Sequence, residues 1–346
     1  MTSCEKINPE VERVSVALTT YNGQRFLLQQ LDSLLAQTRR PDEVVVCDDA
    51  SSDDTWALLE TYAAQHPELK IHRNPVSLGV DRNFLQAMAL CSGTYLMLCD
   101  QDDVWLPEKI ERSLAGMRTL EAQVKAAGKD PLKTPLAVSS RALPVDEQGQ
   151  PFAPLQPRQR TDSRWTWTLL GHASQGCTLL LNRALVDEAL SWPQPDPTQL
   201  LDPETGKPVV YFDWTLGLAA ALQGEKLDLD EVLMHYRIHR KNVTAAPDYY
   251  RGGSWSVRLE RWLKQTPTGY EAYPLYQPKR QVLLRWALSC FAPRIRSDRW
   301  PLVESLLRLH EATRLRDKRK ILRQLPKDYP VRLKVLACLK WLKRRS

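Results

Sequence analysis

The sequence YLMLCDQDDVW, residues 95–105, places three carboxylates directly after a short apolar run. Tyr95–Cys99 has the composition of a buried strand, and Asp100, Asp102 and Asp103 follow it at once. Carboxylates this close together raise one another's proton affinity unless a positive group lies between them. The partner could be a Lys or Arg side chain, water or a hard metal cation. The stretch therefore indicates a polar site at the end of a buried strand.

The same alternation of apolar runs and polar ends occurs throughout the first hundred residues. Strands are expected at Val14–Thr19, Glu43–Cys47, Leu69–Arg73 and Tyr95–Cys99, and amphipathic helices at residues 24–37, 54–65 and 81–91. Continuously apolar strands that alternate with helices are typical of a parallel sheet covered on both faces. The sequence therefore predicts an α/β fold with a mostly parallel sheet flanked by helices.

Three of these strands end in polar clusters, at residues 19–22, at Asp48-Asp49 and at residues 100–103. Ligands of open α/β sheets bind outside the carboxyl ends of the strands. We therefore expect the three clusters to converge on one crevice, although they are far apart in the chain.

The crevice lacks the glycine-rich phosphate loops of common nucleotide-binding proteins. Neither GxGxxG nor GxxxxGK[ST] occurs, so a bound diphosphate needs another counter-charge. Mg²⁺ or Mn²⁺ held by the oxygen ligands of DQDD could supply it. Asp49 could accept an N–H from a pyrimidine edge while Tyr21 packs on the ring, and Arg82 could contact phosphate.

Charge divides the chain of 346 residues unevenly. Residues 276–346 contain 20 Lys and Arg against 5 Asp and Glu, whereas the net charge of the whole chain is only +7. We expect a catalytic domain over residues 1–250 and a basic, largely helical C-terminal region over residues 251–346. No apolar run is long enough to span a membrane, and the N-terminus lacks the apolar core of a signal peptide.

The basic tail allows two interpretations. Three segments, at residues 282–291, 300–309 and 331–342, mix apolar residues and Trp with Lys or Arg. Such helices are typical of an anionic membrane surface, which predicts a cytoplasmic protein that is peripheral on the inner membrane. The alternative is a helical subdomain packed on the catalytic core. Nucleic acid is not an expected partner, because no reader motif accompanies the charge.

Seven ordered segments resemble glycosyltransferase family 2 with the GT-A fold. They are TTYNG (19–23), CDDASSDDT (47–55), SLGVDRNF (77–84), GTYLMLCDQDDVWLPEKI (93–110), GCTLLLNRAL (176–185), FDWTLGLAA (212–220) and LMHYRIHRKNV (233–243). The resemblance covers residues 14–244 and is strongest to bacterial polysaccharide glycosyltransferases that are often described as rhamnosyltransferases. Nothing comparable covers the tail.

The resemblance implies an inverting, metal-assisted transfer of a sugar from a nucleotide-sugar to an acceptor hydroxyl. Asp102 would be a direct metal ligand, and Asp100 would contact ribose or metal-bound water. The implied nucleotide-sugar-binding residues are Thr20, Tyr21, Asn22, Asp49, Arg82, Asp100 and Gln101. The alternative for DQDD is an N-cap cluster that opens a helix near Leu106-Pro107, and capping could be the whole role of Asp103.

The resemblance also implies a general base and a further metal ligand. Asp213, before the apolar run WTLGLAAAL, would accept the proton of the attacking hydroxyl, although it could instead be a helix N-cap. His239 would bind the metal, although it could instead be a surface histidine among Arg237, Arg240 and Lys241. Those three basic residues could close over the diphosphate as a lid.

The expected partners are a dTDP- or UDP-linked sugar donor, with L-rhamnose the first sugar to test, and a glycan or lipid-linked acceptor of surface polysaccharide such as lipopolysaccharide. Two other functions remain open at this point. One is a nucleotidyltransferase, which usually has a glycine-rich loop after the first strand. The other is a membrane-associated adaptor that binds a sugar nucleotide without turnover.

Overall fold

The computed structural model describes residues 12–151, 168, 175–194, 200–201, 212–240, 242, 278–311, 316–317 and 320. Its strands are β1 Val14–Thr20, β2 Glu43–Asp48, β3 Leu69–Arg73, β4 Tyr95–Cys99, β5 Val104–Trp105, β6 Leu136–Val145, β7 Leu179–Asn182 and β8 Glu225–Arg237. Its helices are α1 Leu27–Leu35, α2 Thr55–Ala63, α3 Val80–Leu90, α4 Lys109–Ala126, α6 Arg183–Leu190, α7 Phe212–Gln223, α11 Pro278–Phe291 and α12 Trp300–Glu311, with the 3-10 turns η1 Gly176–Thr178 and η2 Ala292–Arg294.

In the described part of the chain the strands form one sheet in the order β3-β2-β1-β4-β7-β6-β8-β5. Neighbours from β3 to β4 are parallel, and β6 is parallel to β8. β7 is antiparallel to β4 and β6, and β5 is antiparallel to β8. The predicted α/β fold is confirmed, and the four expected strands are found to within one residue. Beyond β4 the sheet is mixed, because these strands do not follow the βα alternation.

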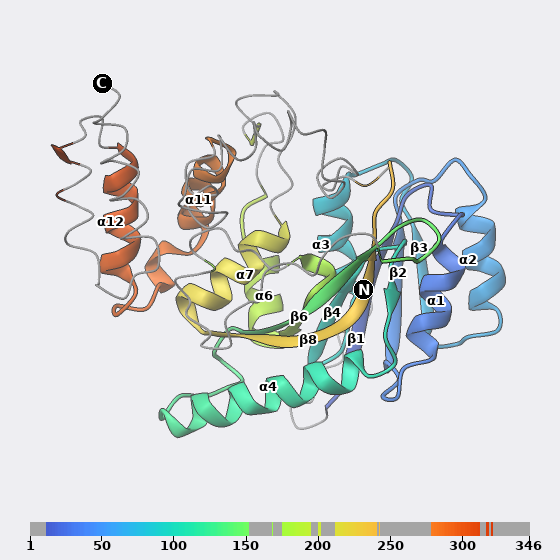
Figure 1. Ribbon diagram of the computed structural model, residues 1–346, viewed down its shortest axis with the longest axis horizontal. Coiled ribbons are helices and arrows are strands. Elements are labelled where there is room, and N and C mark those ends of the chain that lie inside the picture. The colour runs from blue at the N-terminus through green and yellow to red at the C-terminus, as the bar shows by residue number, and fades with distance from the viewer. Residues whose placement is uncertain are drawn as a thin grey trace, which may run out of the picture.

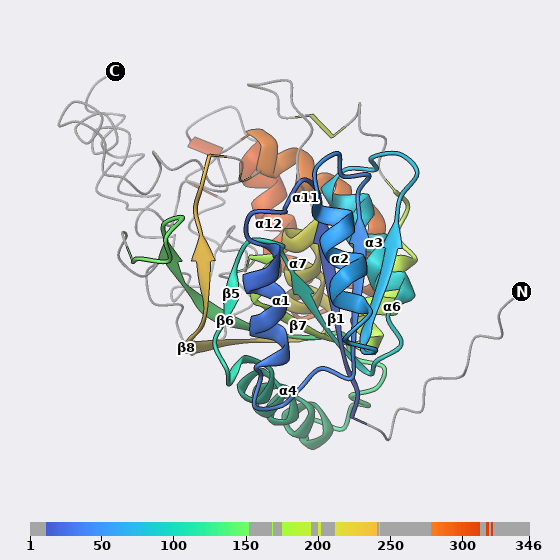
Figure 2. The ribbon, with the colours of Figure 1, turned by 90° about the vertical axis from the view of Figure 1, so that its right-hand side faces the viewer.

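Helices cover both faces of the sheet (Figures 1 and 2). The apolar residues of β1 that alternate toward one face, such as Val16 and Leu18, pack with α1, α2 and α4, which crosses below the strands in both views. Ala17, on the opposite face, packs with α3, α6 and α7. Burial on both faces explains why the strands are continuously apolar.

The described C-terminal helices belong to the same core as α7. Leu288 and Phe291 of α11 and Val303 of α12 lie in the apolar cluster that contains the inner face of α7. Figure 1 shows both helices beyond α7, at the opposite end of the molecule from β3. The apolar sides of two of the three tail segments therefore face protein. The third segment, residues 331–342, lies outside the described residues.

Arg299 fastens the C-terminal helices to the end of α7. Its buried guanidinium donates to the carbonyl oxygens of Ala221 and Gly224, the latter at 2.7 Å, and to Glu225 Oε1 at 2.9 Å. Carbonyls at a helix C-terminus have no partner within the helix, so this cation satisfies them. Among the described residues, none of the helices combines the length and the apolar character needed to cross a membrane.

Candidate active site

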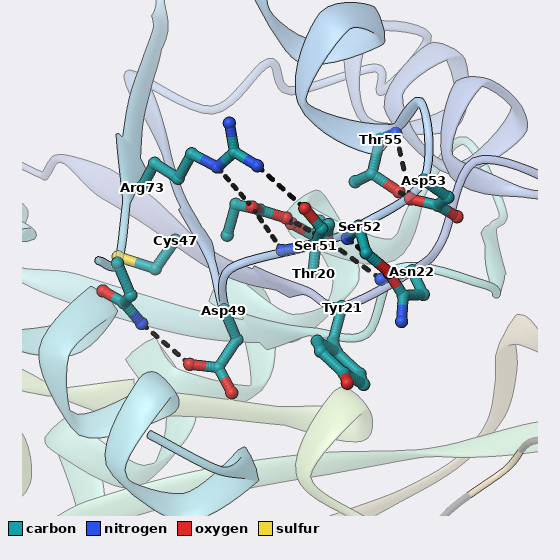
Figure 3. Close-up of polar contacts among 12 residues, drawn as sticks. Thr20, Tyr21, Asn22, Cys47, Asp49, Ser51, Ser52, Asp53, Thr55 and Arg73 are labelled. Carbon is teal, nitrogen blue, oxygen red and sulfur yellow. Dashed lines mark hydrogen bonds and ion pairs between the residues drawn. The ribbon is translucent and has the colours of Figure 1, made fainter. Parts of the chain in front are cut away.

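The loop that follows β1 is joined to the ends of the two neighbouring strands. Tyr21 N donates to Gln101 Oε1 at 2.8 Å, and Gln101 Nε2 donates back to the Tyr21 carbonyl at 3.0 Å. On the other side, Asn22 N donates to Ser51 Oγ at 2.9 Å, and Asn22 Oδ1 accepts from Ser52 N at 2.8 Å (Figure 3). The predicted convergence of the three strand ends is therefore confirmed.

Gly23 permits this close approach of the Gln101 side chain. A Cβ at that position would lie 2.0 Å from Gln101 Oε1, well inside van der Waals contact. Gln101, expected to bind the donor, thus uses its amide to hold two loops together. The hydroxyl of Thr20 is buried and donates to Asp48 Oδ1 at 2.9 Å, so it also acts within the chain. Tyr21 is 53% exposed, so its ring is accessible from solvent and its role in binding the donor stays a prediction.

Asp49 and Tyr21 extend from adjacent strand ends toward the same side of the loop (Figure 3). Asp49 Oδ1 accepts from Asn74 Nδ2 and Leu78 N, and Oδ2 accepts from Ser77 Oγ and Gly79 N, at 2.7 to 2.9 Å. Burial alone would raise the pKa of Asp49, but these hydrogen bonds outweigh it and lower the pKa. A pyrimidine edge would have to share these acceptor positions with the 74–79 loop.

Arg82, the expected phosphate contact, lies on the first turn of α3 with its side chain exposed. The N-terminus of this helix begins after Gly79, whose φ of 84° places it in the left-handed region that glycine adopts without strain. Asp49 therefore holds the backbone that leads into the helix of Arg82, whose contact with phosphate stays a prediction.

Asp102 and His239 meet although 137 positions separate them. His239 Nε2 lies 2.8 Å from Asp102 Oδ2, and both side chains are largely buried. The His239 ring packs against Phe26 with 5.2 Å between ring centroids. Asn242 closes the turn, because its side chain accepts from His239 N and donates to the Arg237 carbonyl at 3.1 Å. The alternative of a surface histidine is wrong for this residue.

Asp100, Asp103 and Cys177 form a second group beside this pair, with one potential ligand atom of each within 4.8 Å of the others. Burial, followed by the neighbouring Asp102 and Asp213 carboxylates, raises the pKa of Asp100 to about 7. Burial also raises the pKa of Asp103 well above its usual range, with Asp102 and Asp100 adding to the effect. The repulsion expected from the sequence is therefore present.

Lys109 is an internal cation of this region. Its side chain is fully buried, its Nζ donates to the Cys177 carbonyl at 2.7 Å, and it lies 4.5 Å from the centre of the Trp105 ring. Burial lowers its pKa to about 8, and Cys177, Cys99, Asp103 and Asp100 oppose that change. Lys109 therefore lies next to Cys177, which groups with Asp100 and Asp103, and the buried Arg237 is a second cation of this region.

Asp103 does not cap the helix that follows it, which corrects the cap interpretation. Glu108 occupies the N-cap position of α4, and the short strand β5 separates Asp103 from it. Asp103 is instead fully buried, and its Oδ1 accepts from Arg237 N at 2.9 Å. Its Oδ2 has no hydrogen-bond partner among the described residues. The sequence did not reveal β5, because two residues are too few for a periodic signal.

Asp213 lies in the first turn of α7 and faces η1. Its Oδ2 accepts from Gly176 N at 3.2 Å, and a Cβ on Gly176 would lie 3.1 Å from Asp213 Cβ. Asp81 Oδ1 accepts from Phe212 N at 3.1 Å, so α3 anchors the start of the same helix. Gly176 adjoins Cys177, whose Sγ lies within 4.8 Å of carboxylate oxygens of Asp100 and Asp103. The 3-10 turn η1 therefore links the expected base to the acids that follow β4.

Several residues of the site were not predicted from the sequence. Lys109, Gly176 and Asp81 lie within the segments that carry the family resemblance, but the sequence analysis assigned them no role. Arg237 was expected in a lid, but it is 2% exposed and its donors point into the protein, so this expectation is wrong. Of the other lid residues, Arg240 is exposed, and Lys241 lies outside the described residues.

Comparisons with known proteins agree with this geometry. Residues 15–185 match the model of glycosyl transferase family 2. The uncharacterized protein Rv1520 of Mycobacterium tuberculosis is 27% identical over 249 residues, 71% of this chain and 64% of that protein. The Escherichia coli UDP-Glc:alpha-D-GlcNAc-diphosphoundecaprenol beta-1,3-glucosyltransferase WfaP is 28% identical over 109 residues, 32% of this chain and 43% of that protein.

Among solved structures, the mannosyltransferase PcManGT from Pyrobaculum calidifontis, in complex with GDP-Man and Mn²⁺, aligns with a TM-score of 0.49 and 18% identity. The alignment covers 95% of this chain and 88% of that one. An α/β sheet whose strand ends carry clustered carboxylates agrees with this family match. The family match lies in residues 15–185, just under half of the chain, and the chain spans about 64% of the length of the first curated relatives that it matches.

Proposed function

We propose that the protein transfers a sugar from a nucleoside-diphosphate-sugar to a hydroxyl of a glycan or lipid-linked acceptor, with inversion at the anomeric carbon. The observation that carries this proposal is the meeting of Asp102 and His239 at 2.8 Å, with Asp213 joined through η1 to the neighbouring acids. A metal ligand pair and a carboxylate base on one crevice are the two groups that such a transfer needs.

The donor set at Asp102 and His239 fits a divalent cation. A carboxylate oxygen and an imidazole nitrogen together suit Mn²⁺, and an all-oxygen set would suit Mg²⁺ better. Asp100, beside them, offers a further oxygen. A bound cation supplies positive charge to the diphosphate that leaves. Arg237 is buried and donates to the Asp102 carbonyl and to Asp103 Oδ1, so it holds the loop of the acids in place before any ligand arrives.

Asp213 acts as the general base in this proposal. The Gly176 amide holds its Oδ2, which fixes the direction of the carboxylate relative to the crevice. The carboxylate takes the proton of the acceptor hydroxyl as that oxygen attacks the anomeric carbon, and the bond to the diphosphate breaks on the opposite side. Inversion follows from this single displacement. The Tyr21 ring and the Asp49 carboxylate border the place for the nucleotide base.

For the donor we propose a UDP- or dTDP-linked sugar. The resemblance to rhamnosyltransferase-type enzymes makes dTDP-L-rhamnose the first candidate. WfaP, which is named for UDP-glucose and a diphosphoundecaprenol-linked acceptor, makes UDP-glucose the second. The same relative supports a lipid-linked acceptor for surface polysaccharide.

We also propose that the protein binds the cytoplasmic surface of an anionic membrane. The net charge of +15 in residues 276–346 supports this location. Because α11 and α12 direct apolar residues toward the core, the attraction would be mainly electrostatic. Sedimentation with anionic vesicles should then decrease steeply as salt is raised, and binding that does not depend on salt would contradict this mode.

The nucleotide site is tested first by thermal melting with UDP, dTDP or GDP in the presence of Mn²⁺, Mg²⁺ or EDTA. A ligand at one hundred times its Kd stabilises the native state by about 2.7 kcal/mol. We expect one nucleotide to raise the melting temperature only with metal, and Asp102→Ala to abolish that rise. Absence of any rise with every nucleotide and metal would refute the proposed donor site.

Catalysis is then separated from binding with Asp213→Asn. This variant should keep the metal-dependent rise in melting temperature and lose turnover by about a hundredfold to ten-thousandfold, measured as nucleoside diphosphate release. Asp187→Asn, an exposed carboxylate on α6, is the matched control and should change neither quantity. Full turnover in Asp213→Asn would remove this residue from the mechanism.

A further inference from the structure

Arg237, the last residue of β8, is buried, and each nitrogen of its guanidinium donates a hydrogen bond to another segment. Its Nε donates to the Asp102 carbonyl at 2.9 Å, Nη1 to the Glu147 carbonyl at 2.8 Å, and Nη2 to Gln29 Oε1 at 2.8 Å. These three acceptors come from the loop after β4, the turn after β6 and the helix α1. One guanidinium therefore joins three segments that are far apart in the chain.

The backbone and the ring neighbours of Arg237 extend the same connection. Its amide donates to Asp103 Oδ1 at 2.9 Å, so both sides of the Asp102-Asp103 dipeptide are attached to this residue. Its guanidinium lies 4.7 Å from the centre of the Phe26 ring. The His239 ring packs on the same Phe26 at 5.2 Å. Phe26 is thus a common platform for Arg237 and His239.

The distance between Asp102 and His239 has a specific meaning for metal binding. Adjacent ligands of an octahedral cation at about 2.1 Å from the metal lie about 3 Å apart. The observed distance between Asp102 Oδ2 and His239 Nε2 is 2.8 Å. The two atoms therefore already have nearly the spacing that two neighbouring ligands of one cation require.

We propose that Arg237 is a positioning residue for the metal site, because it holds Asp102 through its guanidinium and Asp103 through its amide while the shared Phe26 platform sets His239 opposite them. This inference rests on the metal-assisted function proposed above. In this role Arg237 does not bind the metal itself. It fixes the backbone of Asp102, one proposed metal ligand, and it leads directly into the turn that carries His239, the other proposed ligand.

Lysine cannot make the three hydrogen bonds that the Arg237 guanidinium makes. A guanidinium is a planar fork that can direct separate N–H groups at three fixed acceptors, whereas an ammonium on a flexible stem cannot reach all three at once. The Glu147 carbonyl, the Gln29 side chain and the Asp102 carbonyl would then compete for one ammonium. The loop that bears Asp102 would gain freedom while the charge and most of the volume stay unchanged.

The experiment measures Mn²⁺ affinity without nucleotide, from the electron paramagnetic resonance signal of free Mn²⁺, in the full-length protein. Arg237→Lys should weaken the affinity by about tenfold to a hundredfold, as loss of groups that orient metal ligands usually does. Gln29 has an exposed side chain that accepts one of the hydrogen bonds of Arg237. Gln29→Ala removes this acceptor and should also weaken Mn²⁺ affinity, but by less than Arg237→Lys. It also serves as a test if Arg237→Lys does not fold.

Arg112→Lys is the matched control. Arg112 forms a forked pair with Glu231 at 2.7 and 2.8 Å on the exposed side of α4, so the control loses equivalent bonds away from the site. Its Mn²⁺ affinity should equal that of the wild type. Circular dichroism and melting temperature establish that each variant is folded.

The outcomes separate the two proposals. If the wild type binds no Mn²⁺, the metal-assisted function fails and the positioning role fails with it. If the wild type binds Mn²⁺ and both Arg237→Lys and Gln29→Ala bind it equally well while folded, the positioning role alone is overturned. An equal loss in Arg112→Lys would show general destabilisation and would also overturn it.

Discussion

Glu43 makes the most quantitative prediction about stability. It begins β2, its side chain is almost fully buried, and it accepts from Ser15 Oγ at 2.6 Å and from Ser92 N and Oγ at 2.6 and 2.9 Å. It also pairs with Lys70. These partners lie on β1, on β3 and just before β4, so one carboxylate ties together the strands whose opposite ends carry the active site.

The pKa of Glu43 sets the size of the effect. Burial acts to raise this pKa, but the hydrogen bonds from Lys70, Ser15 and Ser92 together lower it from 4.5 to about 2. Each pKa unit corresponds to about 1.4 kcal/mol, so ionised Glu43 stabilises the folded state by about 3 kcal/mol at pH 7. Because Lys70 is half exposed and therefore screened by water, this value is an upper limit.

The pKa values also define the pH range of the effect. A pKa that is lower in the folded chain gives stability that is fully present above pH 4.5 and is lost as the pH falls from there to about 2. In Glu43→Gln the free energy of unfolding should fall by about 3 kcal/mol at pH 7. The difference from the wild type should shrink progressively below pH 4.5.

Urea unfolding followed by circular dichroism at several pH values from 7 to 2.5 measures both quantities. Glu304→Gln is the control, since its carboxylate is 46% exposed in a surface pair with Arg308 and should contribute less than about 1 kcal/mol. A Glu43→Gln difference that stays constant across this pH range would show that packing, and not the ionised carboxylate, is responsible. That result would refute the electrostatic explanation.

Three further substitutions test the close contacts around the site. Gly23→Ala should displace the Gln101 side chain and reduce the free energy of unfolding by about 1–3 kcal/mol. This loss should be smaller when Gln101→Ala is already present, and a double-mutant cycle measured by urea unfolding tests it. Gly176→Ala should push on Asp213 and lower kcat about tenfold or more with a small change in melting temperature; equal kcat would contradict the contact. Arg299→Ala leaves two carbonyl oxygens without their donor and should destabilise the protein by about 3 kcal/mol in urea unfolding, and a loss below about 1 kcal/mol would mean that α12 does not depend on this anchor.

The sheet and its polar edge were predictable because their signals are local. Continuous apolar runs bounded by turn and acidic residues predict buried parallel strands, and the carboxyl ends of parallel strands share one edge. The structure confirms β1 to β4 and the junction of Tyr21, Gln101 and Asn22 with their neighbours. The meeting of Asp102 with His239 followed from the family resemblance, since no local pattern joins residues 137 positions apart.

The partners of individual side chains were not predictable in this way. Arg237 and Arg240 occur three residues apart with the same chemistry, yet one is buried in a network and the other is exposed. Lys109 looks like an ordinary helix residue in the sequence, but the fold buries it against the Cys177 carbonyl, beside the group formed by Asp100, Asp103 and Cys177.

By itself, then, the sequence determined which segments form strands and helices, because periodicity and composition act within a few neighbouring residues. Only the tertiary structure decided which carboxylates are buried, which cation balances them and which face of the C-terminal helices is covered. Burial and charge pairing depend on residues that the chain brings together from distant positions. For that reason Asp103 became a buried acceptor and not a helix cap.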